Sequence, residues 1–176
     1  MSEAAKTETL VETIQQSGII PMGHAREAIH IGIDELPFVS TPDGASIQVL
    51  HIDLNQNLWI LRTNFPAGYQ VDTHYHTGPV FAVTQQGQWF YKEYPDYVNK
   101  AGSYLFEPAH SLHTLTVPAD CPEDTIVWFA IYGSNVNVDE NGNVIGMVDA
   151  KSVLESYRAL CEIEGKSCDK LIVIGE

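Results

Sequence analysis

Two histidine-rich segments decide the fold. Residues 68–79 read GYQVDTHYHTGP and residues 102–113 read GSYLFEPAHSLH. In a β-strand, side chains i and i+2 point to the same face, so His74 and His76 would present two imidazoles side by side. A second strand paired with the first could bring His113 to the same point. Three neutral imidazoles on rigid strands suit a divalent first-row metal and leave coordination positions open for substrate and oxygen.

The chain around these segments consists of short runs that are typical of strands. They are rich in β-branched or aromatic residues and are bounded by Gly, Pro, Asn or Asp. The runs are Ser46–Leu54, Leu58–Phe65, Pro79–Thr84, Gln88–Tyr94, Ser103–Phe106, Leu112–Val117 and Thr125–Tyr132. Many short strands at regular spacing predict an all-β sandwich or barrel in one domain.

The C-terminal third carries three further signals. Asn141-Gly142 lies between apolar residues and predicts a hairpin with a two-residue turn of type I′. Asp149 can cap a helix that ends at the left-handed stop Gly165, with one apolar face formed by Val153, Leu154, Tyr157, Leu160 and Cys161. The apolar tail Leu171–Ile174 predicts a last strand or a contact between subunits.

The combined spacing of the two histidine segments resembles the motifs of the cupin superfamily. The matching positions of both motifs are Gly68, His74, His76, Gly87, Gly102, Pro108 and His113. Val80 (or Phe81 at the longer spacing) occupies the place where the first motif usually carries a glutamate ligand, and His110 replaces a glycine of the second. The resemblance therefore implies a double-stranded β-helix, or jelly-roll barrel, with a three-histidine metal site formed by His74, His76 and His113.

Longer strings narrow the resemblance to one cupin branch. HYHTGPV at 74–80, GQWFYKE at 87–93 and GSYLFEP at 102–108 resemble 2,4′-dihydroxyacetophenone dioxygenase, acetylacetone-cleaving dioxygenase and the cupin part of certain zinc-binding anti-sigma factors. The branch implies a non-haem Fe(II) dioxygenase that cleaves a C–C bond of a β-diketone or α-hydroxyketone with O2, giving carboxylic acids.

A three-histidine site also constrains the substrate and the metal. Three neutral ligands leave the full charge of a divalent ion uncompensated, so the site favours an anionic bidentate substrate such as an enolate. Zinc is redox-inert, which makes Fe(II) the preferred ion, although imidazole also binds Zn, Ni and Mn.

Other polar residues near the motifs are candidates for supporting roles. Glu107 and Glu93 could fix a histidine tautomer or take the substrate proton, or could be rim carboxylates facing water. His110 could be a fourth ligand, a donor behind the ligands or, as its tolerance of left-handed backbone favours, a turn residue. Arg62 could meet a substrate carboxylate or phenolate, with a surface ion pair as the favoured alternative.

Aromatic residues of the predicted strands are expected to line or back the barrel interior, mostly as core. They are Phe81, Trp89, Tyr91, Tyr104, Phe106, Trp128 and Phe129. The lining they would form suits an aromatic or aliphatic ketone better than a sugar or a nucleotide.

The sequence leaves other functions open. A zinc-binding regulatory cupin is one alternative, but the anti-sigma factors carry an additional N-terminal helical domain, and residues 1–44 support at most one short helix. A metal-dependent isomerase or lyase could use the same ligands through an enolate without O2. The third alternative is a barrel that binds no metal and serves only in assembly.

The amino-acid composition limits which classes of partner are expected. The chain has 176 residues with 9 Lys and Arg against 23 Asp and Glu, a formal net charge of −14. That charge argues against nucleic acid or an anionic membrane surface, and no apolar run is long enough to span a bilayer. Three cysteines without CxxC spacing and a polar, acidic N-terminus predict reduced thiols in a cytoplasmic protein. The expected partners are a small-molecule ketone and O2.

The sequence divides into three expected parts. Residues 1–44 would form an N-terminal arm, including a possible short helix within 1–18, and the first strands. Residues 45–148 would form the cupin β-barrel, and residues 149–176 the C-terminal helix and a tail packing on the barrel or a partner subunit. Both faces of Thr125–Tyr132 are apolar, which predicts a homodimer or homotetramer.

Overall fold

The structure is a computed structural model that describes residues 28–176. The short helix expected within residues 1–18 lies outside the described residues. Residues Ile31–Glu176 form one compact unit, to which all the elements named below belong. None of the described helices is both long enough and apolar enough to cross a membrane.

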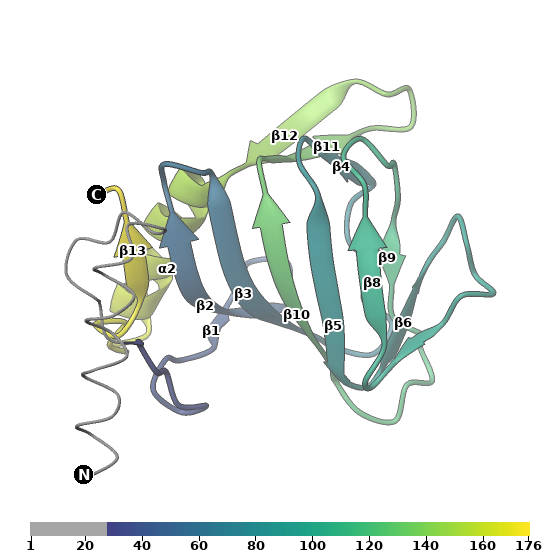
Figure 1. The fold of residues 1–176 in the computed structure, drawn as a ribbon. Coiled ribbons are helices and arrows are strands. Elements are labelled where there is room, and N and C mark those ends of the chain that lie inside the picture. Colours follow the sequence, from purple (N-terminus) through teal and green to yellow (C-terminus); the bar gives the residue numbers. More distant parts are fainter. Residues whose placement is uncertain (1–27) are drawn as a thin grey trace, which may run out of the picture. The chain divides into compact units, whose positions relative to one another are not determined.

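The largest sheet follows the strand order β1-β2-β3-β10-β5-β8, with every neighbouring pair antiparallel. A last strand, β13, pairs with β2 in parallel. Figure 1 shows this sheet in front. Its strands are β1 (Val39–Ser40), β2 (Ser46–Asp53), β3 (Leu58–Phe65), β10 (Thr125–Tyr132), β5 (Val80–Gln86), β8 (Tyr104–Glu107) and β13 (Ile172–Ile174).

Two three-stranded sheets complete the barrel. One follows the order β12-β11-β4 and the other β7-β6-β9. Isolated bridges from Gln70 to Thr116 and from His74 to His113 connect them. Their strands are β12 (Val144–Val148), β11 (Asn135–Val138), β4 (His74–His76), β7 (Asn99–Lys100), β6 (Gln88–Tyr91) and β9 (Leu115–Thr116). The predicted all-β cupin fold is confirmed.

Alternation along the strands places the core inside the barrel. Trp89 and Phe129 are buried as expected, whereas Tyr104 and Phe106 are 64% and 52% exposed. The expectation that these last two back the barrel interior is wrong, because β8 turns Glu107 inward and residues of the opposite parity therefore face outward.

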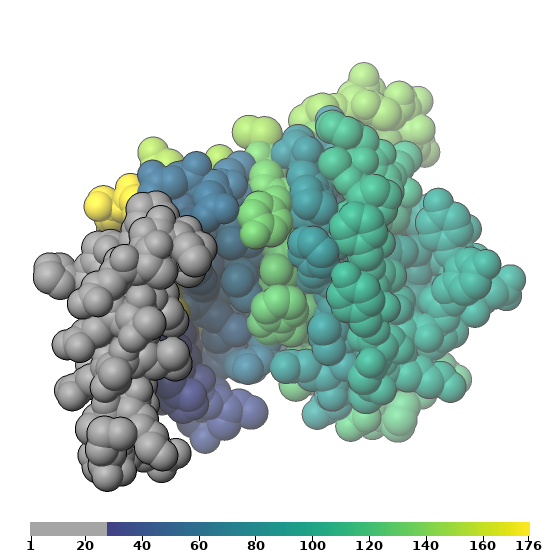
Figure 2. Space-filling view, in the orientation of Figure 1, coloured from purple at the N-terminus to yellow at the C-terminus, as the bar shows by residue number. Residues whose placement is uncertain are grey.

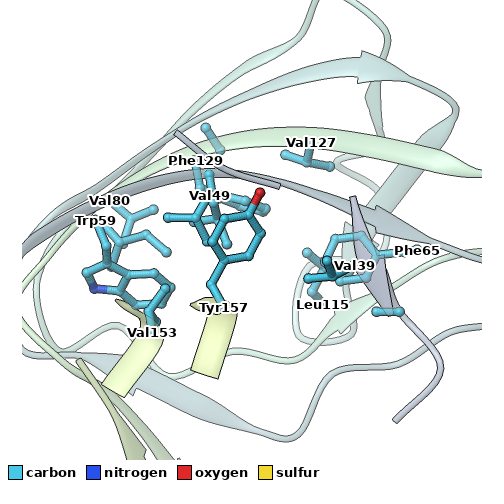
Figure 3. Close-up of a cluster of buried hydrophobic side chains, with 14 of the residues drawn as sticks. Val39, Val49, Trp59, Phe65, Val80, Leu115, Val127, Phe129, Val153 and Tyr157 are labelled. Atoms are coloured by element: carbon cyan, nitrogen blue, oxygen red, sulfur yellow. The ribbon is translucent and has the colours of Figure 1, made fainter. Parts of the chain in front are cut away.

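The predicted C-terminal helix is confirmed as α2 (Ala150–Ile163). Asp149 accepts a hydrogen bond from the Ser152 N–H at 2.8 Å, and the Ser152 hydroxyl accepts one from the Asp149 N–H at 2.8 Å, which forms a capping box. Tyr157 belongs to the same buried cluster as Val49 and Trp59 of the sheet (Figure 3), and its hydroxyl donates to the Pro37 carbonyl at 2.7 Å. This bond ties the helix to the segment before β1.

The hairpin between β11 and β12 is confirmed, but its predicted two-residue type I′ turn is wrong. Gly142 has φ +81° whereas Asn141 stays at negative φ, and a type I′ turn needs both residues at positive φ. The Gly142 N–H instead donates to the Asp139 carbonyl, and the Asp139 side chain accepts from the N–H groups of Asn141 and Asn143. The aspartate therefore sets the longer turn.

We expect Asp149→Ala to destabilise the protein by about 1 kcal/mol, because it removes the side-chain acceptor of the capping box. Chemical denaturation measures the change. Lys151→Ala is the matched control, since its ion pair with Glu155 is exposed and of little energetic weight. Equal stabilities of the two variants would contradict the assignment.

Candidate metal centre

Three histidines converge at one end of the small sheets. His74 and His76 lie on β4, and His113 lies two residues before β9. The N–H of His74 donates to the His113 carbonyl and the N–H of His113 donates to the His74 carbonyl, both at 3.0 Å. All three residues are buried, and one ligand atom from each lies within 4.8 Å of the others. The structure thus brings together the three residues that the sequence singled out.

The loop before His113 owes its shape to a strained residue. His110 has φ +67°, in the left-handed region, and its backbone N–H donates to the His76 carbonyl at 2.8 Å. Its side chain is exposed and contacts the Tyr75 ring, with centroids 5.9 Å apart. His110 is therefore a turn residue that fixes the second motif against β4.

Burial keeps the three imidazoles neutral. It lowers the pKa of His74, and it lowers the pKa of His76 and of His113 to about 3. The Nδ1 atom of His74 lies 2.7 Å from the Asp72 carbonyl, which leaves its Nε2 free for another partner. His74 is therefore a neutral imidazole with one nitrogen held by the backbone, which is suited to binding a metal ion.

Glu107 faces the histidines from β8. Its Oε2 atom lies 3.2 Å from His113 Nε2 and 3.5 Å from His76 Nε2, and its Oε1 accepts a hydrogen bond from the Tyr91 hydroxyl. Burial raises the Glu107 pKa to about 7, although the Tyr91 bond acts in the opposite direction. The Tyr91 ring also stacks on His113, with centroids 4.3 Å apart.

Several polar atoms of this cluster are buried without a hydrogen-bond partner among the described residues. They are His76 Nδ1, Glu107 Oε2 and His113 Nε2. Buried polar groups in proteins are nearly always satisfied, so Glu107 Oε2 and His113 Nε2, which lie 3.2 Å apart, need an explanation. A metal ion bound between the histidines would satisfy His113 Nε2 and offset the cost of burying Glu107.

Glu93 lies outside the cavity. Its exposed carboxylate accepts hydrogen bonds from the Thr114 N–H at 2.9 Å and from the Thr114 hydroxyl at 2.8 Å. Thr114 also shares a 2.8 Å hydroxyl contact with Thr73. Through these contacts Glu93 fixes the segment that carries His113, and in this respect it is a positioning residue. The catalytic role predicted for Glu93 stays a prediction.

A cavity of about 240 Å³ opens beside the histidines. Its lining includes His74, His76, Tyr91 and Glu107 and, from the large sheet, mostly apolar side chains; no Lys or Arg lines it within residues 28–176. The sheet contributes Trp59, Leu61, Thr63 and Phe65 of β3 and Phe129 and Ile131 of β10. The β3 residues were missed from sequence, although their strict i, i+2 spacing is the signal that could have found them.

Arg62 lies away from this cavity, since it is absent from the lining while its neighbours Leu61 and Thr63 are part of it. The possibility that it meets the substrate here is therefore wrong. The favoured surface ion pair is also not formed, because among the described residues Arg62 bonds only to Gln48.

Comparisons with known proteins agree with this geometry. A family model described as a ChrR cupin-like domain matches residues 26–135. A cupin-like protein of unknown function from Ralstonia eutropha JMP134 is 29% identical, with a TM-score of 0.78 over 87% of this chain and 94% of that one. An acetylacetone dioxygenase from Acinetobacter johnsonii is 24% identical, with a TM-score of 0.67 over 79% of this chain and 95% of that one, and shows the fold alone. No curated protein matches the chain.

We expect Glu107→Gln to remove a pH dependence from the stability of the metal-free protein. Folding raises the Glu107 pKa from 4.5 to about 7. The contribution of protonated Glu107 to the free energy of unfolding is therefore fully present below pH 4.5 and is lost as the pH rises through 7. Relative to wild type, the free energy of unfolding of the variant should therefore rise by up to about 3 kcal/mol between about pH 5 and about pH 8.

Denaturation of chelator-treated protein at both pH values measures this gain. Glu140→Gln, in an exposed turn, is the control and should follow wild type at both. Protonation of the buried histidines at acid pH destabilises the wild type and the variants alike, so the test compares each variant with wild type at the same pH. A difference that does not change with pH would contradict the burial of an ionisable Glu107.

Proposed function

This chain belongs to the family of ChrR cupin-like domains, and from that premise we propose that it is a non-haem Fe(II) dioxygenase that cleaves a C–C bond of a β-diketone or an α-hydroxyketone. One observation carries the proposal: three buried, neutral histidines meet beside a mostly apolar cavity, and the buried Glu107 carboxylate faces them. The shared fold with an acetylacetone dioxygenase supports it.

The donor set fits a first-row metal ion. His74, His76 and His113 would hold it through ring nitrogens, and no carboxylate is needed from the usual motif position, which holds the apolar Val80. When bound, Fe(II) supplies open coordination positions for the two substrate oxygens and the one-electron chemistry that O2 requires. Three neutral ligands leave positive charge in the cavity, which favours an enolate over a neutral ketone.

Glu107 is the group that takes the substrate proton. Tyr91 holds its Oε1 atom, so Oε2 stays aimed at the histidines without another partner. Burial raises its pKa to about 7 in the metal-free protein, and the charge of a bound divalent ion would lower this pKa, so Glu107 would be ionised and able to accept a proton at neutral pH. A ketone whose oxygens lie near His76 and His113 brings its acidic carbon toward this oxygen.

The cavity is suited to apolar ketones that enter uncharged and lose one proton at the site. Leu61, Phe65 and Leu115 contribute apolar walls, and no Lys or Arg among the described residues lines it to pair with a phosphate or carboxylate. Besides Glu107, the lining includes the acid Asp43, which accepts a hydrogen bond from the Tyr69 hydroxyl at 2.5 Å. Asp43 would repel substrates that carry a second negative charge.

A zinc-binding regulatory cupin is the second candidate, and the name of the matching family favours it. The same three histidines would bind zinc, which is redox-inert. The cavity and the orphaned Glu107 oxygen favour the enzyme, because a purely structural site has no need of an adjoining empty volume.

We further propose that the outer face of β5 and β8 joins two copies of the chain. Tyr104, Phe106 and Val83 are 64%, 52% and 36% exposed there, and Phe106 contacts Phe81 with centroids 5.5 Å apart. Side chains of these strands form the surface that faces the reader in Figure 2. Apolar patches of this kind mark interfaces, and an uncharged patch suits two copies that each carry a charge of −14.

Anaerobic reconstitution with Fe(II) tests the enzyme directly. We expect O2 uptake with a β-diketone or α-hydroxyketone, and with ¹⁸O2 and an α-hydroxyketone one labelled oxygen in each of the two acids. His76→Ala and His113→Ala should lower bound iron and turnover by more than about 100-fold. His30→Ala, an exposed histidine, is the control.

Three outcomes would count against the dioxygenase. Tight zinc binding without any O2 uptake would favour the regulatory cupin. Conversion of a ketone without O2 uptake would favour an isomerase or lyase. Unchanged metal content in His76→Ala would mean that the histidines do not bind the metal.

Size-exclusion chromatography with light scattering tests the interface. Wild type should be a homodimer or homotetramer, and Tyr104→Glu should shift it to a smaller species because a charge would be buried in an apolar contact. Tyr97→Glu, which changes an equally exposed tyrosine elsewhere, should leave assembly unchanged. A monomeric wild type would overturn this interface.

A further inference from the structure

A second cavity lies on the other face of β3. Along this strand Leu61 and Thr63 point into the cavity beside the histidines, while Arg62 between them lines a separate cavity of about 300 Å³. Figure 1 views the large sheet from this side. The remaining lining consists of Ile33, Phe38, Gln48, Gln85, Gln86 and Ile126, from the leading segment and strands β2, β5 and β10.

Arg62 is held rigidly in this cavity by Gln48. The guanidinium Nη1 donates to Gln48 Oε1 at 2.6 Å. Gln48 is 1% exposed, and its Nε2 donates to the backbone carbonyl of Leu36 at 2.5 Å and to that of Ile33 at 3.2 Å. The amide is therefore fixed with its oxygen toward Arg62, so the guanidinium is preorganised through contacts to backbone carbonyls.

One edge of the guanidinium has no acceptor. Arg62 Nε is buried and makes no hydrogen bond among the described residues, and its Nη1 is already occupied by Gln48. The edge formed by Nε and Nη2 is the planar fork that matches the two oxygens of a carboxylate. Nε is closed to water in this structure, so an acceptor reaches it only when the side chains around it move. Because a buried donor without a partner is unfavourable, the new hydrogen bond would offset the cost of that movement.

The electrostatics of the cavity are unusual for this chain. The protein has 23 acids for 9 basic residues, yet no acid lines the cavity within residues 28–176, and Arg62 forms no ion pair with a described residue. Within residues 28–176, no acid therefore neutralises the charge of Arg62. A single guanidinium without a second cation fits a monoanion better than a phosphate dianion.

We propose that this cavity binds a small organic carboxylate. The carboxylate accepts two hydrogen bonds from the Nε and Nη2 edge of Arg62, and its apolar body packs against Ile33, Phe38 and Ile126. Gln85 lines the same cavity and its side-chain amide can donate to an outer oxygen lone pair, whereas Gln86 Nε2 already donates to the Asp124 carbonyl at 3.0 Å. This site is separate from the histidine cluster and does not depend on a bound metal.

Nuclear magnetic resonance of the full chain, ¹⁵N-labelled and metal-free, tests the site. Sodium butyrate is titrated at constant ionic strength while the Nε–Hε resonances of the arginines are followed. We expect a saturable shift at Arg62 with a millimolar Kd. Arg158, whose guanidinium already pairs with Glu176, is the internal control and should not shift. Butyramide, which has the same shape without the charge, should leave Arg62 unchanged.

A charge-conserving variant separates recognition of the fork from simple attraction. Arg62→Lys keeps the charge and loses the two-pronged edge, so butyrate should bind at least about tenfold more weakly, as followed in both proteins by the backbone amide resonance of Ile126 in the cavity lining. Absence of a shift at Arg62, an equal shift with butyramide, or a shift confined to the histidine side chains would overturn the proposal. The wild-type titration decides between binding and no binding even where the variant fails to fold.

Discussion

The two reciprocal backbone hydrogen bonds between His74 and His113, each 3.0 Å long, join segments almost forty residues apart in the chain. Together with the bridge between Gln70 and Thr116, these bonds hold the segment of β4 beside the segment that leads into β9, which brings the ligand atoms of the histidine cluster together. The N–H of His110 adds a third bond, to the His76 carbonyl. These backbone hydrogen bonds thus set the positions of the three histidines relative to one another.

The chemistry of the site follows from burial around that crossing. Enclosure makes the His76 and His113 imidazoles neutral and raises the Glu107 pKa to about 7, so the cavity holds neutral donors and a base close to its titration point. The overall charge of −14 therefore describes the surface of the protein and not its site. The same strand, β3, presents apolar residues to this cavity and Arg62 to the opposite one.

The strands could be predicted from local sequence because their apolar residues recur in short runs, and the histidine cluster could be predicted because His74 and His76 are spaced two residues apart. Leu58–Phe65 and Thr125–Tyr132 have the predicted bounds, and the cap Asp149 begins the helix as expected. The type I′ turn at Asn141 was wrong because the Asp139 side chain captures the N–H groups that would otherwise follow the Asn-Gly preference. Tyr104 and Phe106 were misplaced because the parity of a short strand depends on which neighbour, here Glu107, is drawn inward.

The roles of Glu107 and Arg62 could not be derived from spacing, since each depends on partners distant in sequence such as Tyr91 and Gln48. We propose that His74, His76 and His113 bind one iron ion. Anomalous diffraction from crystals of the Fe(II)-loaded protein, recorded on both sides of the iron edge, tests this most directly. We expect one iron peak bonded to all three imidazoles, whereas an iron peak elsewhere, or none, would contradict the proposed site.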